Sequence, residues 1–134
     1  MRYLAIDLGD KRTGLAAGDD VTGLVSPVAV IEIRRGDALI DALLKEIDAQ
    51  GSDAIVIGLP LNMDGTEGET AKAARQFGEA LEARTGKPVH YQDERLTSYA
   101  ADQQMAQSGR THKQKKELRD ALAAAEILRD FLDG

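Results

Sequence analysis

The 134-residue sequence predicts one α/β domain over residues 1–134, built on a mixed five-stranded sheet with helices on both faces. Three observations support this fold class. The length suits a single core, the first quarter of the chain holds three strand-like segments in succession, and the remainder alternates helical and strand-like segments. Strands joined by short turns pair antiparallel, whereas strands joined through helices pair in parallel. The predicted order of elements is therefore βββαβαβα.

The first three strands are apolar runs bounded by turns. Residues 3–9 predict a buried opening strand, residues 9–14 a turn and residues 14–17 a second strand, so the fold begins with a hairpin. Residues 24–33 are apolar and β-branched, as a third strand should be. Pro27 lies near the start of this strand, where its missing N–H is tolerated.

The remaining elements alternate between two hydrophobic periods. Apolar residues at helical spacing over 37–50 end at Gly51, a helix stop, and residues 53–60 form a fully apolar strand of the kind covered on both faces. A second helix ends before Thr85 and Gly86. The elements that follow the third strand are helix 37–50, strand 53–60, helix 70–84, strand 88–94, a helix at about 97–108 that is an addition or a connection, and a helix at about 115–132.

The composition excludes several classes of protein. Without cysteine, the chain can form neither a disulfide framework nor a thiolate zinc site. Its first segment reaches an acidic residue after four apolar positions, too few for a signal peptide, so we expect a cytoplasmic protein. A net charge of −6 argues against a broad basic surface for nucleic acid. Five cations nevertheless crowd one stretch, either as a local electrostatic handle or as a solvated surface: Arg110, Lys113, Lys115, Lys116 and Arg119.

Asp7 lies inside the apolar opening strand. An unpaired carboxylate there would cost several kcal/mol in a dry interior, so another group must compensate its charge. Asp7 either caps a turn, pairs with Lys11 or Arg12, or serves as a metal ligand at the end of a central strand. The adjacent turn over 9–14 is rich in N–H groups and cations and would suit a phosphate, although most such hairpin turns are only turns.

Two acidic residues, Asp93 and Glu94, close the fifth strand. Strand side chains alternate, so the two point to opposite faces and only one can share a site with Asp7. Spacing alone leaves open which one does so. The pair could equally be solvated, or help Arg95 or Thr97 to begin the next helix.

Asp120 lies on the core-facing stripe of the last helix. On a helical wheel, Ala124, Ile127 and Phe131 fall within about 40° of its direction. A carboxylate in this position either reaches water at the sheet edge or meets a cation. Lys116, one turn earlier, offers an internal ion pair as the alternative to a functional site.

Together, Asp7, Asp120 and one residue of the pair at 93–94 are three carboxylates on separate elements, each awkward in a plain core. Such a set predicts an oxygen-rich site for Mg²⁺ or Mn²⁺. Neither His90 nor His112 lies in a zinc-ligand pattern, and His90 is expected to pack in the core. Constellations for a serine or cysteine nucleophile are absent from the sequence, so covalent catalysis fits poorly.

Four blocks of sequence carry a resemblance that covers almost the whole chain. They are AIDLGDKRTGLA (5–16), GLPLNMDGTEGETA (58–71), QDERLTSYAA (92–101) and KELRDALAAAEIL (116–128). In these blocks the chain closely resembles the YqgF or RuvX-like family of pre-16S ribosomal RNA nucleases, which are relatives of the RuvC-type Holliday junction resolvases.

The resemblance implies a ribonuclease H-like fold in which Asp7, Glu94 and Asp120 are the catalytic and metal-binding residues. It also implies cleavage at the 5′ end of precursor 16S ribosomal RNA. RuvC-type enzymes commonly carry a further acid in the last helix, but Ala123 stands there in this chain, so a second metal ion would be held less firmly. We expect six residues to contact the substrate: Lys11, Arg12, Asn62, Arg95, Lys113 and Lys116.

The sequence is also compatible with three other functions. The chain could resolve branched DNA instead of cutting ribosomal RNA, and enzymes of branched substrates often need two active sites, which makes a homodimer possible. A strand followed by DLGDKRTG also resembles the phosphate loop of actin-like ATPases and sugar kinases, although those build their cleft from two such domains. Finally, the protein could be a non-catalytic nucleic-acid-binding factor in transcription or ribosome assembly.

Overall fold

The computed structural model describes residues 1–94 and 112–134. The order of elements agrees with the predicted βββαβαβα, and the helix expected at about 97–108 lies outside the described residues. The elements are β1 (Arg2–Leu8), β2 (Thr13–Asp19), β3 (Val25–Ile31), α1 (Asp37–Gln50), β4 (Ala54–Leu59), α2 (Glu69–Thr85), β5 (Val89–Asp93) and α4 (His112–Asp133).

The strands form one mixed sheet in the order β3-β2-β1-β4-β5, with β1 at its centre. The first three strands are joined by short turns and pair antiparallel. β4 pairs in parallel with β1 on one side and with β5 on the other, as strands reached through a helix do. The predicted mixed five-stranded sheet is therefore confirmed.

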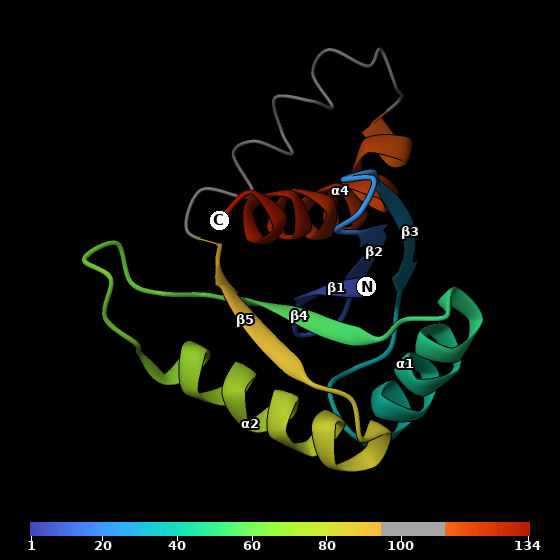
Figure 1. The fold of residues 1–134 in the computed structure, drawn as a ribbon. Coiled ribbons are helices and arrows are strands. Elements are labelled where there is room, and N and C mark those ends of the chain that lie inside the picture. The colour runs from blue at the N-terminus through green and yellow to red at the C-terminus, as the bar shows by residue number, and fades with distance from the viewer. Residues whose placement is uncertain (95–111) are drawn as a thin grey trace.

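Helices cover both faces of this sheet (Figure 1): α1 and α2 lie on one side and α4 lies on the other. Side chains alternate along β1 and so contribute to the core on both faces of the sheet. Leu4 and Ile6 pack into the core under α1 and α2, whereas Tyr3 and Ala5 pack beneath α4. Every residue of β4 is buried, as its unbroken apolar run predicts.

The boundaries differ from the predicted ones by a few residues. β2 was expected to stop at Ala17, before a polar stretch, but it pairs with β1 as far as the partners Arg2 and Asp19. Sheet pairing thus extends a strand that composition alone would end. Within the described parts of the chain, no helix has the length and apolarity needed to cross a membrane.

Candidate active site

Asp7 lies near the C-terminal end of β1, the central strand. Because Tyr3 and Ala5 pack beneath α4, alternation puts Asp7 on the same face of the sheet. The side chain is partly buried at the point where the sheet ends. This is the position in which the sequence predicts a functional carboxylate.

Glu94 follows directly after β5 and joins Asp7. Along β5, His90 contacts Phe131 of α4, with ring centroids 5.3 Å apart, so alternation directs Glu94 to the α4 face as well. There the carboxyl groups of Glu94 and Asp7 are hydrogen-bonded to each other. Asp93 contributes a neighbouring negative charge to Glu94. Strand alternation alone does not decide whether Asp93 or Glu94 lies beside Asp7. In the structure it is the Glu94 carboxyl group that contacts Asp7.

α4 carries Asp120 to the same end of the sheet. Gly14 of β2 is the direct pairing partner of Asp7. A Cβ at Gly14 would lie 2.7 Å from the backbone nitrogen of Ala121 and would overlap the carbonyl oxygen of Asp120. The backbone of α4 therefore packs directly on β2 at this glycine. As a result, the charge of Asp120 acts on Asp7 and raises its pKa.

The Asp7–Glu94 pair holds a proton at neutral pH. Burial, the negative charge of Asp7 and the hydrogen bond between the two groups raise the pKa of Glu94 to about 9. Burial also raises the pKa of Asp7, which the hydrogen bond with Glu94 opposes. Glu94 thus donates its proton to the Asp7 carboxylate, and two acids share one negative charge in a partly dry site.

Two arginines offset the charge of Asp120. Nε of Arg12 lies 3.4 Å from Oδ2 of Asp120. Burial raises the pKa of Asp120, whereas the charges of Arg12 and Arg119 lower it. The same Oδ2 atom is buried and accepts no hydrogen bond from the described residues. It therefore keeps lone-pair capacity for a further ligand.

The donor chemistry suits a hard divalent cation, although the side chains are not arranged around one. Among residues 1–94 and 112–134, no group of three or more His, Asp or Glu side chains is placed to hold a metal ion. Glu94 bonds Asp7 through a proton, and Asp120 is paired with Arg12. A cation could replace that proton between Asp7 and Glu94, and Oδ2 of Asp120, which lacks a hydrogen bond within the described part of the chain, would be the third oxygen of the set.

Three of the six predicted substrate contacts, Lys11, Arg12 and Asn62, lie in the described part of the chain, in the loops that follow β1 and β4. Lys11 is exposed in the turn between β1 and β2, next to Arg12. Asn62 is exposed, but Nδ2 of this residue donates to Oγ1 of Thr66 at 3.0 Å and so braces its own loop. Arg95 and the side chains of Lys113 and Lys116 lie outside the described part of the structure.

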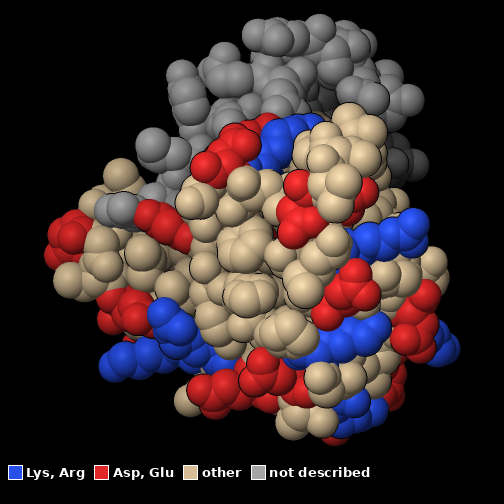
Figure 2. Space-filling view, viewed as in Figure 1, with Lys and Arg blue, Asp and Glu red and all other residues tan. Residues whose placement is uncertain are grey.

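The surface charge agrees with an acidic protein. On the face shown in Figure 2, blue lysine and arginine side chains alternate with red acidic ones.

The expectation that His90 packs in the core is wrong. His90 is exposed at the edge of the sheet, although its ring contacts Phe131 and Tyr3.

Two features of the site did not follow from the sequence analysis. One is Gly58 of β4, whose missing side chain leaves room for the Glu94 carboxylate. The signal for it is present in the sequence, because a glycine inside a buried strand commonly marks a close approach by another group. The other is the identity of the partner of Asp120, which is Arg12.

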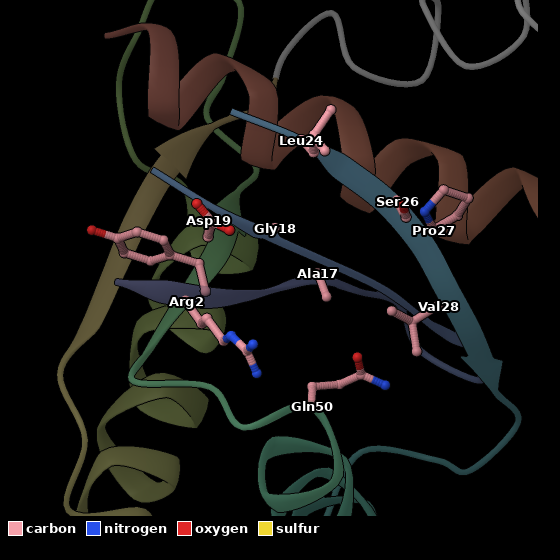
Figure 3. Close-up of a pocket in the computed structure, with 10 residues that line it drawn as sticks. Arg2, Ala17, Gly18, Asp19, Leu24, Ser26, Pro27, Val28 and Gln50 are labelled. Atoms are coloured by element: carbon pink, nitrogen blue, oxygen red, sulfur yellow. The ribbon is translucent and has the colours of Figure 1, made fainter. Parts of the chain in front are cut away.

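A separate hollow of about 530 Å³ lies at the opposite end of β1 (Figure 3). Its lining includes Arg2, Asp19, Ser26 and Gln50, from β1, β2, β3 and the end of α1. Oδ1 of Asp19 accepts hydrogen bonds from the two backbone N–H groups that follow in its turn, both at 2.8 Å. Asp19 therefore serves to order that turn, and the hollow brings no cluster of acidic groups together.

A mixed sheet in the order β3-β2-β1-β4-β5, covered by helices on both faces and bearing carboxylates at the end of its central strand, defines a protein of ribonuclease H-like fold. Comparison with known proteins supports this class. A family model described as RuvX, Holliday junction resolvase, matches residues 1–134, and the chain belongs to this family.

Curated relatives match over nearly their full length. A protein of Anaeromyxobacter sp. (strain Fw109-5), named "Putative pre-16S rRNA nuclease", is 41% identical over 134 residues, which is 100% of this chain and 98% of the relative. A protein of the same name from Thiobacillus denitrificans is 42% identical over 131 residues and is covered to 90%. The predicted family is thus confirmed.

Solved structures share the fold at low sequence identity. The fowlpox virus resolvase in complex with Holliday junction DNA has a TM-score of 0.63 at 10% identity, with 99% of this chain and 97% of that chain covered. Thermus thermophilus RuvC in complex with a Holliday junction has a TM-score of 0.59 at 14% identity, covering 98% and 94%.

Family membership confirms the predicted class of activity. The protein is a nuclease, nucleic acid is its class of partner, and a divalent metal ion is the cofactor that this family of nucleases indicates.

Proposed function

We propose that this nuclease cleaves phosphodiester bonds at Asp7, Glu94 and Asp120 with Mg²⁺ or Mn²⁺ as cofactor, in maturation of the 5′ end of precursor 16S ribosomal RNA. One observation carries the proposal of the site. Carboxylates from β1, from the end of β5 and from α4 lie at the same end of the sheet, and those of Asp7 and Glu94 are hydrogen-bonded to each other.

Each residue has a role that its chemistry supports. Asp7 and Glu94 would hold the cation in place of their shared proton, and Asp120 would contribute its Oδ2, which accepts no hydrogen bond from the residues that the structure describes. The bound ion would supply Lewis-acid stabilisation of the charge that develops on the phosphate oxygens. When Asp120 turns to the cation, the guanidinium of Arg12 is released and can pair with a phosphate of the substrate.

The remaining cations would position the nucleic acid. Lys11 is exposed beside Arg12, and we propose that Lys113, Lys116 and Arg95 follow the phosphate backbone, with Asn62 in the neighbouring loop. Aromatic residues make up only 4% of the chain, so recognition by broad base stacking is disfavoured and phosphate and shape recognition should dominate.

The choice of RNA rests on the curated relatives, whose printed name refers to pre-16S rRNA. Branched DNA is the second candidate, because the family description and the fowlpox and Thermus resolvases refer to Holliday junctions. A homodimer would serve the second substrate better, since its two symmetric cuts need two sites.

The test is cleavage of precursor 16S RNA and of a four-way DNA junction by purified protein, with Mg²⁺, with Mn²⁺ and with chelator. Asp7→Asn keeps the shape of the side chain but removes its charge, and we expect it to abolish cleavage. Asp41→Asn, at an exposed ion pair on α1, is the matched control and should cut normally. Undiminished metal-dependent cleavage by Asp7→Asn would overturn the proposed site, and cleavage of the junction alone would overturn the RNA assignment.

A further inference from the structure

Asp7 and Glu94 come from strands that do not touch each other. β4 lies between β1 and β5, so the two backbones are about 10 Å apart at the usual strand spacing. Neither side chain can span that width alone, and the two carboxyl groups can meet only above β4. What β4 presents at this point therefore decides whether the pair can form.

β4 presents a glycine there. The parallel register pairs Ile6 with Ile57, so Gly58 is the next position along and lies beside Asp7. Val56 of the same strand packs under α4, and alternation puts position 58 on that face too. An alanine Cβ at Gly58 would overlap Oε2 of Glu94, a contact that real Cβ atoms essentially never make, and would lie 3.0 Å from its Cδ atom, which is tighter than most Cβ contacts.

The same alanine would also clash with a core residue, so an effect on the position of Glu94 must be distinguished from an effect on packing. The same Cβ would lie 2.5 Å from Cδ1 of Ile127 on α4, so Gly58 also fits the core. Both obstructing groups are side-chain atoms and not backbone: Glu94 is only partly buried and can turn away, whereas Ile127 is fully buried and must shift within the core. An alanine at position 58 therefore requires Glu94 to move, and Ile127→Val removes the second obstruction without touching Glu94.

We infer that Gly58 is a positioning residue for the active site: its missing side chain keeps open the path by which the Glu94 carboxylate crosses β4 to reach Asp7. An alanine at this position displaces Glu94 from Asp7. The consequence for metal binding rests on the proposed function, whereas the placement of Glu94 does not.

The first test is the crystal structure of Gly58→Ala beside that of the wild-type protein, both without metal. We expect the variant to keep its sheet and to show Glu94 turned away from Asp7. A Glu94 carboxylate still bonded to Asp7 in the variant would overturn the inference, whatever the protein cleaves.

The second test is Mn²⁺ affinity by calorimetry, without substrate. Loss of a group that orients a metal ligand typically weakens metal affinity about 10- to 100-fold, and we expect a loss of this size in Gly58→Ala. Gly58→Ala/Ile127→Val removes the clash with Cδ1 of Ile127 and should still bind Mn²⁺ weakly. Recovery of affinity in this double variant would show that packing alone is responsible and would overturn the inference.

Two further variants complete the design. Gly78→Ala is the matched control, because its Cβ would meet the end of the Tyr91 side chain, 2.9 Å from Cζ, and we expect unchanged Mn²⁺ affinity. In a Glu94→Ala background, an alanine at Gly58 has no carboxylate to displace and should cause no additional loss. An additional loss there would contradict the inference, whereas a wild-type protein that binds no Mn²⁺ would contradict the proposed function.

Discussion

Replacing Glu94 by glutamine should stabilise the metal-free protein at alkaline pH while it removes a residue of the proposed site. The folded state raises the pKa of Glu94 to about 9, far above its ordinary value of 4.5. The folded protein therefore binds this proton more tightly than the unfolded chain does. The stability linked to it is complete below the ordinary pKa and is lost as the pH rises through the window between the two values.

The size of the effect follows from one proton. Between about pH 5 and about pH 8, a full difference of one proton would cost about 4 kcal/mol of unfolding free energy. Asp7 shares the proton and water reaches part of the pair, so we expect a loss of about 1–2 kcal/mol in the wild-type protein. Glutamine is neutral and its amide N–H can still donate to Asp7, so Glu94→Gln should lose none of this contribution.

The assay is urea unfolding followed by circular dichroism, in chelator, at several pH values across this window. We expect equal stability of wild type and Glu94→Gln at the acidic end, and a variant that is more stable at the alkaline end. Glu79→Gln on the exposed side of α2 is the control for loss of a surface carboxylate and should follow the wild-type curve. Parallel curves for wild type and Glu94→Gln would refute a proton shared between Glu94 and Asp7.

Three further predictions follow from the same contacts. Gly14→Ala pushes against the backbone of α4 and should lower the unfolding free energy by about 1–3 kcal/mol; a stability equal to wild type in urea would contradict the close packing described above. Arg12→Gln should change the unfolding free energy by less than about 1 kcal/mol, because its ion pair with Asp120 is partly exposed. It should nevertheless weaken RNA binding in gel-shift titrations, whereas the control Lys45→Gln on α1 should not. Equal RNA affinity of the two variants would contradict the role of Arg12. Binding of Mn²⁺ at neutral pH should release about one proton, measured by calorimetry in two buffers of different ionisation enthalpy, and no dependence on the buffer would contradict replacement of the proton by the cation.

The sequence predicted the strands and helices well because their hydrophobic periods are clear. Burial of Asp7 and Asp120 followed from the same periods, since each acid stands in an apolar pattern. The choice between Asp93 and Glu94 could not be made from alternation, because it requires knowing which face α4 covers. That face is set by packing of residues far apart in sequence, such as His90 on Phe131.

Charge pairing was equally beyond sequence reasoning. Local spacing offers Lys116, one turn earlier, as an alternative partner of Asp120, and Lys11 or Arg12, in the adjoining turn, as an alternative partner of Asp7. In the structure Arg12 pairs with Asp120. Contact between the turn and the helix arises because Gly14 lets α4 pack directly on β2, which no helical or strand period encodes.

Gly14 on β2 and Gly58 on β4 lie on either side of Asp7 in the sheet, and each leaves space above the sheet for a different group. At Gly14 the missing side chain admits a helix backbone, and at Gly58 it admits a carboxylate from beyond the next strand. Both crowd negative charge onto Asp7, which a simple core would avoid. In the metal-free protein a proton and Arg12 relieve that repulsion, and rising pH removes the proton. Higher pH should therefore weaken the empty fold and strengthen cation binding, so that stability and metal affinity change in opposite directions for the same reason.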